Sequence, residues 1–471
     1  MLEPTTTSAD GLPTPRRYVA IAAISFGTAL VVIDGAIATV ALPTIARDLG
    51  VDNSAAVLVV TVYQLVLVMT LLPFSALGDK IGLRRLYQYG QIVFTVATIL
   101  CFFARSLPFL LVIRAVQSLG AAAALSVSSA MVRSIYPTRH LGRGMGVNSV
   151  VVSSANALAP TLGGLILAVA PWPWVFAAAA PFGLISLLLG RALPDPPRRG
   201  ASFDVLGAVL CAATFGLIIS GMESGVHGDS PVISGAIVLV GAAIGIFFVR
   251  RELGEPTPIL PVDLLAKPVM ALSMLGALAA FLASMTLLLS IPFRLQHEFG
   301  FTPSEVGAVI APWPLTTMFV APAAGVLSDR VPAGLLGGIG MALSIVALVF
   351  LAFLPPDPSY FDLAWRMALC GSGFGLFLSP NARLIIGSAP RTRAAAVGGM
   401  ISTTRMLGQT LGATLFATIL AFGLGGGSTP ALVAAGLALV AGLCSIARLR
   451  PEIHNPARAE ADSAQPAEQV R

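Results

Sequence analysis

The chain alternates between long apolar runs and short polar segments. Each apolar run is close to the length of about 20 residues that a helix needs to cross the hydrocarbon core of a bilayer. The pattern predicts fourteen membrane-spanning helices, at residues 19–43, 55–77, 86–104, 108–132, 144–169, 173–192, 203–222, 231–249, 268–291, 304–327, 333–354, 361–380, 394–422 and 430–447.

Arginine and lysine divide unevenly between the predicted loops. Outside the helices, only Arg47, Arg105 and Arg294 fall on the side opposite to the chain ends. Because basic loops stay in the cytoplasm, both ends of the chain are predicted to be cytoplasmic. An error of one helix in the count would mix the two groups of loops, so their separation supports fourteen spans.

Composition agrees with a membrane protein and excludes several other classes. Hydrophobic residues make up 56% of the chain, charged residues 11%, and the mean hydropathy is +0.88, whereas soluble domains are about 25% charged. The net charge of +6 comes from short basic clusters between apolar runs, so no nucleic-acid partner is predicted. The four cysteines and four histidines are scattered, which predicts no metal site, no cofactor and no catalytic constellation, and therefore no enzyme.

Three features recur at nearly the same offset along the chain. Asp79 after the second run corresponds to Asp329 after the tenth, Arg114 to Arg366, and Arg143 to Arg393. This repeat predicts an all-α polytopic protein with two homologous six-helix halves, separated by two inserted helices. Duplicated membrane halves are typical of alternating-access transporters. The expected units are a cytoplasmic tail at 1–18, a six-helix bundle at 19–192, a linker with two helices at 193–267, a second bundle at 268–447 and a tail at 448–471.

The segment after the second run resembles the cytoplasmic signature of the major facilitator superfamily, in its fourteen-helix drug:proton antiporter branch. In that signature an Asp, a Gly three residues later and basic residues latch the two halves in one state. Leu83 and Ser75 depart from the usual pattern. The latch residues that the resemblance implies, including a second copy after the tenth run, are Gly78, Asp79, Gly82, Arg84, Arg85, Asp329 and Arg330.

Two charged residues inside predicted spans resemble the proton-coupling positions of this family. Asp34 is followed by Ala41-Leu42-Pro43 as in the fourteen-helix branch, and Arg114 stands in the buried-arginine motif of the fourth span. A lone carboxylate inside a membrane is by default a proton or cation site. Asp34 could also be a counter-ion for substrate or part of a structural pair with Arg114, and Arg114 could extend to the outer interface.

The fifth span resembles the motif that is associated with exporters of the family. The matching residues are Ala159, Pro160, Gly163 and Gly164, and alanine replaces the usual glycine at positions 155 and 159. Small residues allow helices to approach closely and proline bends the helix. Generic packing of small residues remains an alternative explanation.

The resemblance implies a monomeric secondary transporter of the cell (inner) membrane that exchanges protons for small amphipathic molecules and exports them by alternating access. A dedicated exporter of one metabolite or antibiotic is the main alternative, and a proton-coupled uptake permease is a second. The charge of the substrate stays open, because three arginines against one deep acid also suit an anion or a zwitterion. The pocket is expected to be lined by Tyr63, Gln64, Gln117, Asn148, Asn156, Arg405 and Gln409.

Overall fold

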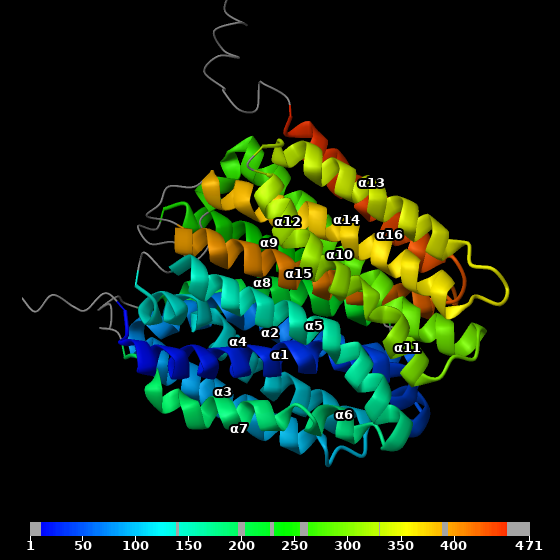
Figure 1. Ribbon diagram of the computed structural model, residues 1–471, viewed down its shortest axis with the longest axis horizontal. Coiled ribbons are helices and arrows are strands. Elements are labelled where there is room, and N and C mark those ends of the chain that lie inside the picture. The colour runs from blue at the N-terminus through cyan, green and yellow to red at the C-terminus, as the bar shows by residue number, and fades with distance from the viewer. Residues whose placement is uncertain are drawn as a thin grey trace, which may run out of the picture.

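The computed structural model describes residues 11–137, 141–195, 203–226, 230–254, 262–328, 330–388 and 394–449. These residues form α-helices joined by short connections (Figure 1). The helices are α1 Thr14–Leu49, α2 Asn53–Ile81, α3 Leu83–Cys101, α4 Leu107–Ile135, α5 Leu141–Val169, α6 Pro173–Ala177, α7 Ala180–Leu189, α8 Val205–Val226, α9 Pro231–Glu252, α10 Pro268–Glu298, α11 Pro303–Ile310, α12 Pro312–Leu327, α13 Ala333–Ala352, α14 Tyr360–Gly387, α15 Ala394–Ala421 and α16 Thr429–Ala447. Two short 3-10 helices, η2 Gly190–Ala192 and η3 Val262–Ala266, follow α7 and precede α10.

Each of the fourteen predicted spans coincides with one helix or with a broken pair of helices. The pairs are α6–α7 and α11–α12, and the second helix of each restarts with a proline in its first turn, a position that tolerates the missing N–H. Within the described residues, 11 helices, each broken pair being counted once, are long and apolar enough to cross a membrane. The three other predicted spans correspond to α3, α5 and α15, which are helices of 19, 29 and 28 residues.

The helices lie roughly parallel and separate into two groups (Figure 1). The blue to cyan helices α1–α5 lie on one side, together with α6 and α7, and the yellow to red helices α13, α14 and α16 lie on the other. The buried core extends across both groups: one apolar cluster joins Val40 of α1 to Met341 of α13 and Phe377 of α14. The two groups are therefore packed against each other at this level of the structure.

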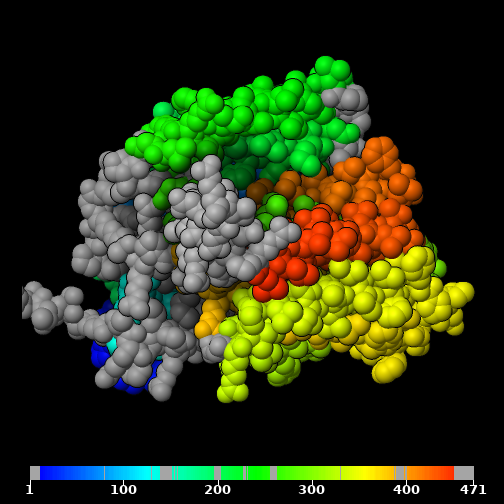
Figure 2. Space-filling view, turned by 90° about the horizontal axis from the view of Figure 1, so that it is seen from above, coloured from blue at the N-terminus to red at the C-terminus, as the bar shows by residue number. Residues whose placement is uncertain are grey.

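The two inserted helices lie along one flank of the molecule. Figure 2 shows them in green beside the orange α15. Helix α8 packs on both α2 and α15, whereas α9 packs mainly on α8 and is the more exposed of the two. At the start of α8, the Arg251 guanidinium of α9 binds Asp204 at 2.6 Å and holds the pKa of that carboxyl below its usual range.

The turn between α2 and α3 needs glycine. Gly82 has a φ of 107°, a conformation that side-chain-bearing residues rarely adopt. One residue therefore ends α2 at Ile81 and starts α3 at Leu83. Gly78, one turn earlier, lies against Val127 of α4, where a Cβ would approach the valine side chain to 2.6 Å. The glycines of the predicted latch thus allow a tight turn and a close contact between helices.

Candidate functional site

Asp34 lies in the middle of α1 with no exposed surface. One carboxylate oxygen, Oδ2, forms an ion pair with Arg114 of α4. The other oxygen, Oδ1, accepts a hydrogen bond of 2.8 Å from Nε2 of Gln117. The only deep acid of the predicted spans is therefore fully paired, as a buried carboxylate must be.

Arg114 is equally inaccessible, and its guanidinium makes hydrogen bonds through two of its three nitrogens and lies near two aromatic rings. Nη1 also donates to Oε1 of Gln117 at 2.6 Å, and Nε donates to the carbonyl oxygen of Val59 at 3.2 Å. The ring centroids of Tyr63 and Phe176 lie 4.2 and 5.2 Å from its Cζ, a cation–π arrangement. Nη2 has no hydrogen-bond partner among the described residues.

Gln117 connects three helices. It lies three residues after Arg114 on α4, so both side chains share one face of that helix. Besides Asp34, its Nε2 donates to Oγ1 of Thr98 on α3 at 2.8 Å. Gln117 was predicted as a pocket residue, and the structure places it inside the Asp34–Arg114 network with no exposed surface. Thr98 was not predicted, because a single threonine in an apolar run carries no distinguishing signal.

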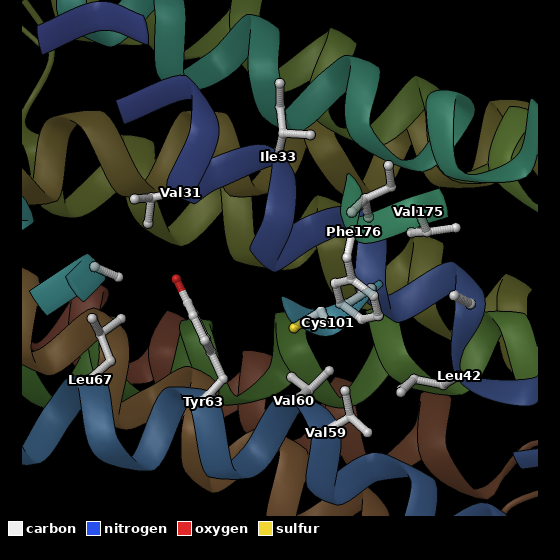
Figure 3. Close-up of a cluster of buried hydrophobic side chains, with 14 of the residues drawn as sticks. Val31, Ile33, Leu42, Val59, Val60, Tyr63, Leu67, Cys101, Val175 and Phe176 are labelled. Atoms are coloured by element: carbon white, nitrogen blue, oxygen red, sulfur yellow. The ribbon is translucent and has the colours of Figure 1, made fainter. Parts of the chain in front are cut away.

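Tyr63 and Gln64 lie next to this network on α2. Figure 3 shows the Tyr63 side chain extending from α2, with its hydroxyl toward α1 and with Phe176 and Cys101 nearby. The hydroxyl has no partner among the described residues. Gln64 contacts Sδ of Met285 on α10 at 3.9 Å through Nε2, and its Oε1 is unpaired. These two side chains retain hydrogen-bonding capacity that the described protein does not use.

Arg405 and Gln409 lie one turn apart on α15 and are both partly exposed. Nε of Arg405 is buried without a hydrogen-bond partner in the described part of the chain. The side chains of Asn148 and Asn156, the other predicted pocket residues, lie outside the described residues. The predicted pocket residues are thus distributed over α2, α4, α5 and α15.

The exporter-type motif of α5 lies at an inter-helix junction. Gly163 faces Ile37 of α1, where a Cβ would lie 2.8 Å from the isoleucine Cγ1. Gly164 faces the start of α11, where a Cβ would lie 2.6 Å from the carbonyl oxygen of Pro303. Ala159 and Pro160 are buried beside them, and Gly307 of α11 lies against the carbonyl of Pro160. The predicted close approach is present, and it joins α5 to both α1 and α11.

The predicted latch is described only in part. Arg84 donates to the carbonyl oxygen of Arg191 at 3.1 Å, and Arg85 and Arg330 are exposed. The Asp79 side chain lies outside the described residues, as does Asp329. The second-half counterpart of Arg114 differs from it, because Arg366 pairs with Asp362 on its own helix at 3.2 Å. No group of three metal-ligating side chains occurs among the described residues.

Comparison with known proteins identifies relatives along nearly the whole chain. The sequence profile of the Major Facilitator Superfamily matches residues 24–413 and 273–470. An uncharacterized transporter of Escherichia coli K12, YebQ, is 45% identical over 94% of this chain and 97% of its own length. The riboflavin transporter RibZ of Clostridioides difficile is 29% identical over 86% of this chain and 89% of its own length. The multidrug resistance protein Stp of Mycobacterium tuberculosis is also 29% identical, over 86% and 76%.

The fold also matches solved structures. A bacterial homologue of the human lysosomal transporter Spinster, solved in an inward-facing and unoccupied conformation, gives a TM-score of 0.64 with 18% sequence identity. The match covers 97% of this chain and 100% of that one. At this identity the match establishes the shared fold.

Proposed function

We propose, because the chain belongs to the Major Facilitator Superfamily, that it is a proton-coupled antiporter that exports small amphipathic organic molecules. The family and the apolar helices make it a multi-pass membrane transporter of small molecules. The observation that carries the proposal is the fully buried network of Asp34, Arg114 and Gln117. The names of relatives such as Stp favour export of varied compounds.

Proton exchange at Asp34 would act through the charge balance of this network. With Asp34 ionised, the buried Asp34–Arg114 pair has no net charge. Protonation of Asp34 removes the counter-ion and leaves the Arg114 cation without compensation, which is costly in a low-dielectric interior. The free energy of the protonated protein is then lower in a conformation in which water or another group solvates Arg114. Protonation is thereby coupled to conformation.

The energy for export comes from the proton gradient. Each proton that enters the cell supplies about 2.3 kcal/mol per 100 mV of membrane potential and about 1.4 kcal/mol per unit of pH difference. In this proposal the helices α1–α7 and α10–α16 are the two halves that rock. The Arg-rich loops face the cytoplasm, and Asp34 takes up its proton from outside the cell membrane.

Two other functions belong to the same class. The riboflavin transporter RibZ favours a dedicated transporter of one metabolite as the alternative to a multidrug exporter. An uptake permease has the same fold, and the direction of transport separates it from an exporter. The resemblance of the α5 motif to the motif of the family's exporters supports export.

Efflux in everted membrane vesicles tests the proposal. Vesicles are energised with a pH gradient, and gradient dissipation is recorded on addition of riboflavin, methyl viologen and a series of aromatic acids, amides and amines. The wild-type protein should dissipate the gradient with at least one compound, and Asp34→Asn should abolish the response. Asp48→Asn, at the exposed end of the same helix, is the matched control and should retain it. Equal responses of wild type and Asp34→Asn would remove Asp34 from proton coupling.

A further inference from the structure

Three arginines inside the described spans have an acidic partner among the described residues. Arg114 pairs with Asp34, Arg294 with Glu298 at 3.1 Å, and Arg366 with Asp362. Arg405 differs from these three. No hydrogen bond or ion pair joins it to another described residue.

Arg405 is deep in the membrane region. It lies about 16 Å from the first residue of α15, at 1.5 Å per residue, in a helix of 28 residues. Placing a cation at such a depth is unfavourable in free energy unless a partner or a water-filled cavity compensates its charge. The side chain is partly exposed, so it is not fully enclosed by the described protein.

The face of α15 that carries Arg405 borders α10, since Gly412 on nearly the same face packs against Leu282 of α10, and α15 also lies beside the N-terminal helices. Gln409 and Phe416 follow Arg405 on the same face, at helical spacing. Phe416 is buried in the apolar cluster that includes Leu42 of α1 and Leu67 of α2. Helix α15 also packs along α2, the helix that carries the unpaired Tyr63 hydroxyl and Gln64 amide oxygen.

Helix α2 and helix α15 carry polar groups of different chemistry. Gln64 lies about 16 Å from the start of α2, so it is also near the middle of its helix of 29 residues. The groups of α2 are neutral and can donate or accept single hydrogen bonds. Arg405 offers a permanent positive charge with a fork of donors that matches a carboxylate.

We propose that Arg405 is the anion-recognition residue of the transport site, and that the substrates are amphipathic organic acids: an apolar aromatic body with a carboxylate that binds Arg405. This inference rests on the proposed transport function and specifies its substrate class. A dicationic compound would have to approach an uncompensated arginine and is excluded as the preferred substrate. The Asp34 carboxylate does not offset this charge, because Arg114 and Gln117 occupy both of its oxygens.

Direct binding to the purified protein tests the substrate class without requiring transport. The probes form three matched sets, built on benzene, naphthalene and pyrene. Each set contains an acid, an amide and an amine of the same ring system. Isothermal titration measures their affinity for wild type, Arg405→Gln and Arg405→Lys. Arg105→Gln, an exposed arginine outside the spans, is the control.

Wild type and Arg105→Gln should bind at least one acid in preference to its amide and amine. Arg405→Gln should lose about tenfold or more of the affinity for the acid while its affinity for the amide stays unchanged, which also reports that the variant is folded. Arg405→Lys should recover part of the loss. Preference of wild type for the amines, binding of no acid in any set, or equal acid binding by Arg405→Gln would each overturn the inference. The Asp34→Asn experiment is independent, because it can fail while acid binding succeeds.

Discussion

At the scale of single residues, Arg114 contributes hydrogen bonds and ring contacts as well as a positive charge. Its guanidinium donates to Asp34, Gln117 and the Val59 carbonyl at once. The rings of Tyr63 and Phe176 lie within cation–π distance. A lysine ammonium is compact, so it cannot satisfy these planar and forked contacts together. The geometry of Arg114 is therefore expected to matter as much as its charge.

Arg114→Lys should lower proton-coupled efflux by about tenfold or more, because one lost charge-assisted hydrogen bond costs about 1.5–3 kcal/mol. Initial rates of efflux in energised vesicles measure the effect, with expression level and thermal stability recorded in parallel. Arg105→Lys provides the matched conservative change at an exposed site. Wild-type rates in Arg114→Lys would show that positive charge alone is sufficient at this position.

Part of the residue-level site could be predicted from sequence and part could not. Asp34 and Arg114 are ionisable residues inside apolar runs, and the cost of burying each one predicts that it needs a partner. The role of Gln117 and the contact with Thr98 depend on packing between α1, α3 and α4, which no local pattern encodes. The lack of a hydrogen bond or ion pair from Arg405 to another described residue likewise depends on how the helices pack, which no local pattern encodes.

At the scale of elements, the helices themselves could be predicted well because the bilayer imposes their length and polarity. The breaks between α6 and α7 and between α11 and α12 were not predicted, since the apolar runs continue through them. The close contact of α5 with α11 depends on Gly164 and Gly307, where backbone approaches backbone. Small residues permit such contacts, but sequence does not identify which helix is the partner.

Gly164→Val should impair transport, because the added side chain would collide with the carbonyl of Pro303 and hold α5 away from α11. Overpacking of this kind costs about 1–3 kcal/mol, and here the cost falls on the conformation in which the two helices touch. Efflux rates measure the change. Gly436→Val, in α16 where a side chain meets open space, should leave transport unchanged. Normal efflux by Gly164→Val would mean that this contact is dispensable.

At the scale of the whole molecule, the glycine-mediated contacts between α5 and α11 lie toward one end. Gly164 and Gly307 belong to the last turns of α5 and the first turns of α11, which the loop charges place on the outer side. Alternating access requires contacts at one end to separate when the site opens there. These contacts are therefore expected to part when the protein faces outward.

A reversible cross-link between Thr161→Cys and Ser304→Cys should arrest transport, because the link would prevent opening. Thr161 donates to the Gly307 carbonyl at 3.4 Å, and Ser304 lies beside Gly164, one turn away along each helix. A short, cleavable thiol reagent is applied to vesicles, and efflux is measured before and after reduction. The four native cysteines are buried, so wild type treated in the same way should stay active. Undiminished efflux by the fully linked protein would rule out separation of these helix ends.

The position of α8 makes the two sides of the molecule unequal toward the lipid. Where α2 meets α15, α8 covers the junction. The opposite junction involves α5 and α12, and α12 leaves Phe319 and Val326 largely exposed. A compound dissolved in the acyl chains is therefore expected to reach the junction of the two halves from the α5–α12 flank, because α8 covers the junction on the other flank.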